Sequence, residues 1–170
     1  GGALACDASE DEGVAVELDA GSCTIHHGHI LHYTRGNSTR TFYGRGPVPR
    51  RPAILWRYPA GRPMCAISIV GRTAPLWCGN GWTGQPSVVA RGDGDEVIFG
   101  AYDRQIHFLD GATGRERRPN FPTGDIVKGS VSVDPDGFPL LYSGSRDNYF
   151  RVIALDRVRP TELWRLSAAD

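Results

Sequence analysis

Four histidines within seven residues form a dense group of potential metal ligands: His26, His27, His29 and His32. Imidazole nitrogens bind zinc, copper and nickel, so a tract of this composition indicates a possible metal site. In an extended strand the side chains alternate between two faces, and His27 and His29 would therefore share one face. At most two ligands then converge, and we favour an exposed His-rich strand, with His27 and His29 as the candidate ligands.

Four cysteines are spaced as two local pairs, Cys6 with Cys23 and Cys65 with Cys78. None belongs to a Cys-x-x-Cys motif, which excludes a zinc ribbon or a thioredoxin-type site. An even number in a turn-rich chain favours two disulfides and an oxidising compartment, whereas buried thiols in a cytosolic protein are the alternative. The Cys65–Cys78 pair is the better supported, because a hairpin over residues 66–77 would bring its ends within the roughly 5.5 Å that a disulfide requires.

Two acidic loops, residues 93–95 and 134–137, contain the Asp and Gly residues of calcium loops. Each falls between two apolar runs, where Asp, Pro and Gly are the residues that a turn requires. Neither supplies the six to eight oxygen ligands of calcium. We interpret both as turns, and no Ser–His–Asp or nucleotide-binding motif is found elsewhere.

Short apolar runs separated by turns supply the elements that would position these residues. Glycine (22) and proline (12) make up a fifth of the 170 residues and interrupt every candidate helix. The runs that read as strands are 67–70, 87–90, 96–101, 106–109, 130–133, 140–143, 150–155 and 162–166. This pattern predicts an all-β protein.

Composition and charge narrow the class of function. The chain is 40% hydrophobic and 22% charged, which is ordinary for a globular domain with a core. Nineteen basic residues cancel nineteen acidic ones, so no overall field attracts nucleic acid. The longest apolar runs are a few residues, far short of the roughly 20 needed for a membrane-spanning helix. We therefore expect neither a nucleic-acid partner nor a membrane span.

The strands repeat with an offset of 44 residues. This offset places Asp103 on Asp147 and Gly100 on Gly144, and a two-residue insertion then places Leu109 on Leu155. Asp103 and Asp147 would each lie in a tight hairpin between two strands. Four strands in about 40–45 residues is the period of a β-propeller blade with a four-stranded antiparallel sheet.

The repeat divides the chain into a lead-in and about three blades. Residues 1–32 are an extended acidic lead-in that ends in the His-rich strand, and blades follow at 33–83 (degenerate), 84–127 and 128–166. Propellers close with roughly four to eight blades. We therefore expect the N-terminal portion of a larger propeller, completed by more of the same chain, by a second chain or by self-association.

Four residues form the predicted ligand surface of this propeller: Trp82, Gln85, Asp125 and Lys128. They lie in equivalent segments before the innermost strand of each blade, where side chains reach the mouth of the central channel. Lys128 is the only lysine in the chain and stands close to Asp125. A shielded lysine can act as a base or nucleophile, but a salt bridge between neighbouring blades is the interpretation we favour for this pair.

Residues 108–116, Phe-Leu-Asp-Gly-Ala-Thr-Gly-Arg-Glu, resemble the Ala-Leu-Asp-x-x-Thr-Gly-Lys-x-x-Trp repeat of quinoprotein-like propellers, the PQQ-like repeat family. A second copy is found at 154–156 and 162–164, and residues 33–58 are similar to the segment that opens such propellers. In the first copy Arg118 occupies the position at which the motif has its docking tryptophan, whereas the second copy has Trp164 at that position. The resemblance implies the fold more than an activity.

A quinoprotein dehydrogenase of this family would hold pyrroloquinoline quinone (PQQ) over a tryptophan, with calcium, a catalytic Asp and often a vicinal Cys–Cys pair. Cys65 and Cys78 are thirteen positions apart in the sequence and cannot form that vicinal pair. We therefore expect a secreted, cell-surface or periplasmic module that binds or scaffolds a protein or glycan through its channel mouth, without a cofactor and without enzymatic activity. A PQQ- and calcium-dependent oxidoreductase is the first alternative, and a carbohydrate-binding propeller with Trp82 as sugar platform is the second.

Overall fold

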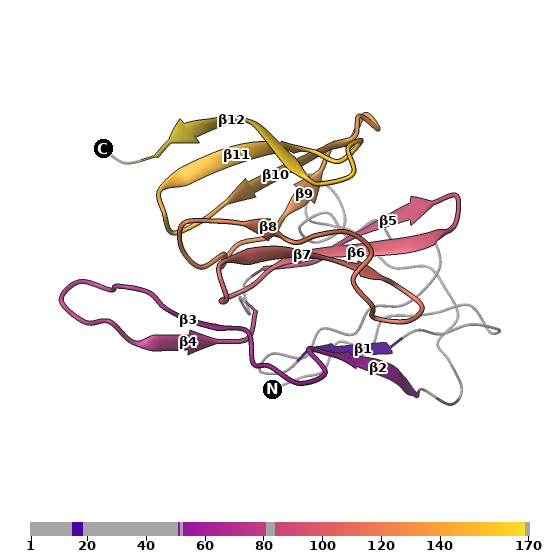
Figure 1. Ribbon diagram of the computed structural model, residues 1–170, viewed down its shortest axis with the longest axis horizontal. Helices are drawn as coiled ribbons and strands as arrows, with labels where there is room; N and C mark the ends of the chain where they lie inside the picture. The colour runs from indigo at the N-terminus through magenta and orange to yellow at the C-terminus, as the bar shows by residue number, and fades with distance from the viewer. Residues whose placement is uncertain (1–14, 19–50, 52, 81–83, 169–170) are drawn as a thin grey trace.

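Every regular element in the described part of the chain is a β-strand. The computed structural model describes residues 15–18, 51, 53–80 and 84–168, and within them it contains no helix. The strands form two four-stranded and two two-stranded sheets, stacked in layers (Figure 1). The prediction of an all-β protein with four-stranded antiparallel sheets is confirmed for these residues.

The first four-stranded sheet is an antiparallel meander at the centre of the stack. Its strands are β5 (Ser87–Arg91), β6 (Gly94–Gly100), β7 (Gln105–Asp110) and β8 (Phe121–Pro122). Residues of β6 and β7 alternate between two apolar sets, as a strand buried on both faces requires.

The second four-stranded sheet lies on the first and repeats its order. Its strands are β9 (Ser132–Val133), β10 (Leu140–Gly144), β11 (Tyr149–Ala154) and β12 (Thr161–Ser167). The hairpins β6–β7 and β10–β11 both turn through a residue with positive φ, Arg104 (65°) and Asn148 (64°), which are 44 positions apart. The predicted equivalence of the Asp103 and Asp147 hairpins is therefore confirmed.

The predicted equivalence of Leu109 and Leu155 is wrong, although both side chains are buried. Leu109 pairs with Val97, and at the same place in the second sheet Ile153 pairs with Leu141. Leu155 instead corresponds to Gly111, because each donates its backbone N–H to the equivalent carbonyl across the hairpin. The two-residue insertion lies after this point, in the β11–β12 turn.

A continuous apolar core joins the two large sheets. Ile98, Ile106 and Phe108 of the first sheet are completely buried against Leu141 and Ile153 of the second. Full burial of such a side chain stabilises the fold by about 1.5–3 kcal/mol. This face-to-face packing fixes the second sheet on the first.

The opposite face of the first sheet is covered by the N-terminal elements. Strand β2 (Ile54–Tyr58) pairs in parallel with β1 (Ala15–Leu18). Trp56 and Tyr58 of β2, with Met64, pack against Val97 and Phe99. Both faces of the central sheet are therefore buried.

A disulfide-closed hairpin lies beside these layers (Figure 1). Strands β3 (Cys65–Ile67) and β4 (Leu76–Cys78) pair so that Cys65 stands opposite Cys78, with a Cα–Cα distance of 4.1 Å and the sulfurs bonded. The predicted Cys65–Cys78 disulfide is confirmed. No helix that could cross a membrane occurs among the described residues.

Candidate functional site

The linker between the two large sheets carries two of the predicted ligand-surface residues, Asp125 and Lys128. It starts at Thr123, after β8, and its backbone is tied to both hairpins. Val127 donates its N–H to the carbonyl of Ala101 in the β6–β7 hairpin, and Arg146 in the β10–β11 hairpin donates its N–H to the carbonyl of Ile126. The linker therefore has a defined position at the hairpin end of the sheets.

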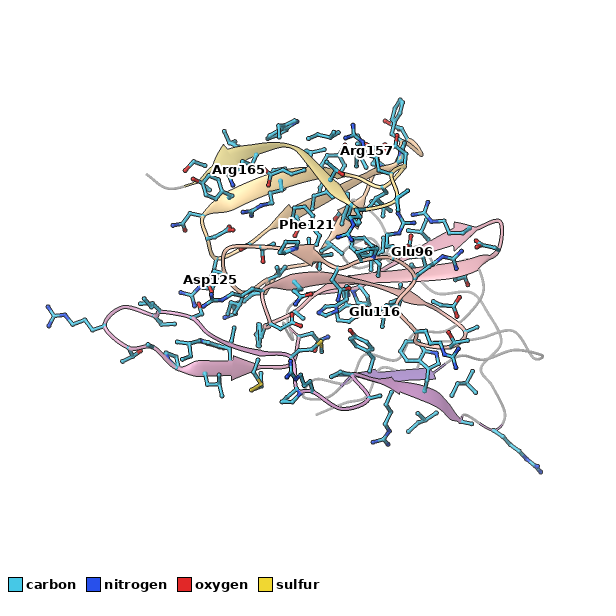
Figure 2. All side chains as sticks on the ribbon, viewed as in Figure 1. Glu96, Glu116, Phe121, Asp125, Arg157 and Arg165 are labelled. Atoms are coloured by element: carbon cyan, nitrogen blue, oxygen red, sulfur yellow. A yellow bond between two sulfur atoms is a disulfide. The ribbon has the colours of Figure 1, made fainter. Side chains whose placement is uncertain are left out.

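Asp125 is half-buried and accepts two hydrogen bonds at its carboxylate. Ser68, at the end of β3, donates its hydroxyl to Oδ2 at 2.9 Å, and the backbone N–H of Ile126 donates to Oδ1 at 2.7 Å. Ser68 is buried. The carboxylate thus fastens the β3–β4 hairpin to the linker, and Figure 2 shows Asp125 between that hairpin and the large sheets.

Lys128 lies over an aromatic ring of the same hairpin. Its Nζ is 4.7 Å from the ring centroid of Trp77, a distance typical of a cation–π contact. Trp77 donates its indole N–H to the carbonyl of Ser68 at 3.3 Å and packs edge-on against Tyr102. The half-buried indole is therefore held in place from two sides and presents one face to the lysine.

Gln85 lies beside the linker, as the repeat predicts. Its backbone N–H donates to Ser130 Oγ at 2.9 Å. A Cβ added to the neighbouring Gly84 would come within 2.7 Å of the carbonyl oxygen of Gly129, so the two equivalent segments run almost in contact. The structure thus brings Gln85, Asp125 and Lys128 to one end of the sheets.

Several sequence predictions lie outside the described residues. These are Trp82, the Cys6–Cys23 pair, and the candidate metal ligands His27 and His29. Within 53–80 and 84–168, no three His, Cys, Asp or Glu side chains are grouped as a metal site would require. The predicted ligand surface is therefore described through Gln85, Asp125 and Lys128.

Sequence reasoning missed the contribution of the β3–β4 hairpin to this surface. Ser68 and Trp77 contact Asp125 and Lys128 across about 50 residues of sequence. The available signal was the disulfide, since a hairpin closed at Cys65–Cys78 presents a fixed tip to whatever packs beside it. The polar and aromatic groups gathered here can recognise a ligand through charge, hydroxyl and ring contacts.

A second polar cluster, also missed, lies between β2 and the central sheet. His107 is buried, with Nε2 3.0 Å from an Asp103 oxygen and Nδ1 3.0 Å from the Tyr58 hydroxyl. Tyr58 donates its O–H to Glu116 at 3.2 Å. Burial, with the adjacent negative charge of Glu116, raises the pKa of Tyr58 above its ordinary value. The hydrogen bonds of Asp103, His107 and Tyr58 therefore join β2 to the central sheet.

Comparison with known proteins adds no assignment. No family model matches the chain, and no curated protein matches it significantly. The functional argument therefore depends on the geometry of the Asp125–Lys128 region.

Proposed function

We propose that this chain is a binding module of an oxidising compartment, such as the periplasm or the cell surface, built as part of a β-propeller. The two stacked four-stranded sheets with a 44-residue offset support the propeller, since blades of that fold pack in this way. The Cys65–Cys78 disulfide supports the compartment.

The ligand surface of the proposed module comprises Trp77, Gln85, Asp125 and Lys128, and the buried Ser68 holds the Asp125 carboxylate from below. The observation that carries the proposal is the contact of Lys128 with Trp77 beside the Asp125–Ser68 hydrogen bond. A cation, a carboxylate and an indole lie together at one end of the sheets, on segments that other contacts hold in place. Such a surface suits a polar segment of a protein or a glycan as its ligand, and the ligand would be bound without chemical change.

Binding of the purified chain to glycan and peptide arrays, followed by titration of the best ligand, tests this proposal. Lys128→Ala should weaken binding at least tenfold, because it removes the cation from the Trp77 face. Arg157→Ala is the matched control, since it removes the same charge at the other end of the β9–β12 sheet (Figure 2), and it should change the affinity less than twofold.

Two outcomes would overturn the proposal. One is the absence of any saturable ligand, and the other is a ligand whose affinity is unchanged by both Lys128→Ala and Asp125→Asn. Retention of a quinone absorbance after addition of PQQ and calcium would instead favour an oxidoreductase.

A further inference from the structure

The β3–β4 hairpin projects beyond the other layers, with β3 on the side of the large sheets and β4 on the opposite side (Figure 1). Across the hairpin, Ser68 donates its backbone N–H to the carbonyl of Pro75, and Val70 and Thr73 exchange hydrogen bonds. In an antiparallel pair, the residues between such positions point their N–H and C=O groups outward. Each side of the hairpin therefore has an outer row of backbone groups, which belong to Ile67 and Ile69 on the β3 side and to Ala74, Leu76 and Cys78 on the β4 side.

The outer row on the β3 side is occupied by two guanidinium groups. Arg104 donates to the carbonyl of Ile67 at 2.5 Å, and Arg146 donates to the carbonyl of Ile69 at 2.8 Å. These arginines belong to the β6–β7 and β10–β11 hairpins of the two large sheets. A further strand is excluded from this side, because the carbonyls that its N–H groups would need are already bonded.

The outer row on the β4 side is open in the part of the chain that the structure describes. Strand β4 pairs with β3 alone. Within residues 53–80 and 84–168, no hydrogen bond reaches the backbone N–H or C=O groups of Ala74, Leu76 or Cys78. The hairpin therefore has one closed edge and one open edge.

Pro75 does not interrupt the open row. The N–H that proline lacks would have pointed inward, at the carbonyl of Ser68, and the indole N–H of Trp77 donates to that carbonyl instead. Residues 74–78 also carry no charge. A charged side chain or a proline in the outer row usually protects an edge strand from pairing, and this edge has neither device.

The face of the hairpin that is turned away from the linker is apolar and exposed. Ile67, Ile69 and Leu76 are 54%, 67% and 65% exposed. Ile67 and Leu76 stand directly opposite each other. The residue of an added strand that pairs with Leu76 would place its side chain on this same face, so an apolar side chain is favoured there.

The open row specifies the kind of occupant. Alternating donors and acceptors along one edge match an extended peptide, which adds to the hairpin as a further strand. The hairpin, residues 65–78, contains Arg72 and no acidic residue, so charge complementarity favours a peptide with an acidic flank. A second copy of the chain is disfavoured, because an edge of residues 74–78 is far smaller than the roughly 800 Å² that each partner of a stable dimer buries.

We infer that the outer edge of β4 is a binding site for an extended segment of a partner protein, with apolar residues at alternate positions and an acidic flank. The Cys65–Cys78 disulfide fixes the base of the hairpin, so little of the edge has to be ordered on binding. The site lies on a different side of the hairpin from the Asp125–Lys128 region, and the inference does not depend on the ligand bound there.

The probe is a synthetic peptide selected from a random seven-residue library displayed on phage, with the full chain as target. Selected sequences should alternate apolar residues and carry Asp or Glu at one end. Methylation of single backbone nitrogens then tests strand pairing, since it removes one N–H and keeps the side chain. We expect about tenfold weaker binding at alternate residues and less than about twofold at the residues between them, because only every second N–H of a strand faces its neighbour.

Two measurements on the chain locate the peptide. Leu76→Pro removes one outward N–H of the β4 side without touching the bonds inside the hairpin, and it should weaken binding about tenfold. Ile67→Pro is the matched control on the β3 side and should change the affinity less than about twofold. Amide hydrogen exchange of the unsubstituted chain needs no variant: the peptide should slow exchange at Leu76 and Cys78 and leave Ile67 and Ile69 unchanged.

The inference fails if the library yields no saturable peptide, if the methylation effects lack a period of two, or if Ile67 and Ile69 are protected in place of Leu76 and Cys78. Binding that is lost in Lys128→Ala and kept in Leu76→Pro would also contradict it, while supporting the ligand surface proposed above. A dimer in sedimentation velocity that Leu76→Pro abolishes would show that a second copy is the occupant and would contradict it as well.

Discussion

The β5–β8 and β9–β12 sheets have the same strand order and the same hairpin geometry but satisfy an equivalent polar position in different ways. In the second sheet Arg151 bonds both to Asp147, in its own hairpin, and to Glu162 of β12 at 3.0 Å. In the first sheet the equivalent His107 is too short to span both carboxylates. It contacts Asp103, and Tyr58 of β2 connects it to Glu116.

The comparison shows how one position of the repeat can hold two different side chains. In each large sheet, one carboxylate lies in the hairpin and a second lies beyond the third strand, and a side chain of the third strand connects the two. A long guanidinium does this within one sheet, whereas a shorter imidazole needs a hydroxyl from the neighbouring layer. Which side chain can occupy this repeat position therefore depends on the groups that the neighbouring layer supplies.

Truncation of the equivalent residues Ile106 and Phe150 provides the largest expected contrast between the sheets. Ile106→Ala should lower the free energy of unfolding by about 2–5 kcal/mol, because it leaves a cavity between the two layers. Phe150→Ala should cost less than about 1 kcal/mol, because Phe150 lies on the uncovered face. Equilibrium denaturant unfolding measures both, and equal losses would show that the exposed face of the β9–β12 sheet around Phe150 is covered in solution.

Alanine at the equivalent glycines should have effects of opposite sign. Gly100→Ala should destabilise the protein by about 1–3 kcal/mol, since the new Cβ overlaps Val127 in a packed core. Gly144→Ala should stabilise it by up to about 1 kcal/mol, because a strand residue with open space gains from a less flexible unfolded state. Thermal and denaturant unfolding report both, and a destabilising Gly144→Ala would contradict the open space at that position.

Removal of the Tyr58 hydroxyl tests the bridge that only the first sheet has. Tyr58→Phe should lower the free energy of unfolding by about 1 kcal/mol, because His107 loses its Nδ1 partner while the ring packing is kept. Tyr142→Phe is the matched control on the second sheet. Its hydroxyl meets only the half-buried Asp134 of the β9–β10 turn among the described residues, and its loss should have the smaller effect on the denaturant midpoint.

The hairpins and the repeat offset could be predicted from the sequence because their determinants are local. Asp103 and Asp147 lie beside turn residues that accept positive φ, and the disulfide follows from the short distance along the chain between Cys65 and Cys78. The equivalence of Leu109 and Leu155 failed for the opposite reason. The sequence shows a Leu-Asp pair in both repeats, and it does not show where along the chain the two-residue insertion lies. Only the strand pairing locates the insertion, because Leu109 and Ile153 occupy the same place in the two sheets.

The candidate site was predicted only in part. The linker positions of Asp125 and Lys128 followed from the repeat, but their partners Ser68 and Trp77 belong to a hairpin with no counterpart in the repeat. The bridge from Tyr58 to His107 likewise connects different layers. Contacts between layers depend on how sheets stack, and no spacing within one strand records that.

The acid stability of the second hairpin supplies a comparison that depends on pH. Burial pushes the pKa of Asp147 upward, but hydrogen bonds from Arg151 and from the N–H of Gly124 outweigh it and hold the pKa at about 2, below the ordinary 3.8. A carboxyl with a lowered pKa stabilises the folded state above about pH 4, and that contribution disappears as the pH falls from about 4 to about 2.

Asp147→Asn should therefore reduce the loss of stability over this window without abolishing it, because Asp110, bonded to Thr113, also has a lowered pKa. Denaturant unfolding at pH 2, 3, 4 and 6 measures the slope, and Arg151→Gln should flatten it in the same way by removing the main partner of the carboxylate. A slope unchanged in both variants would show that the Asp147–Arg151 pair does not distinguish the second sheet from the first in acid.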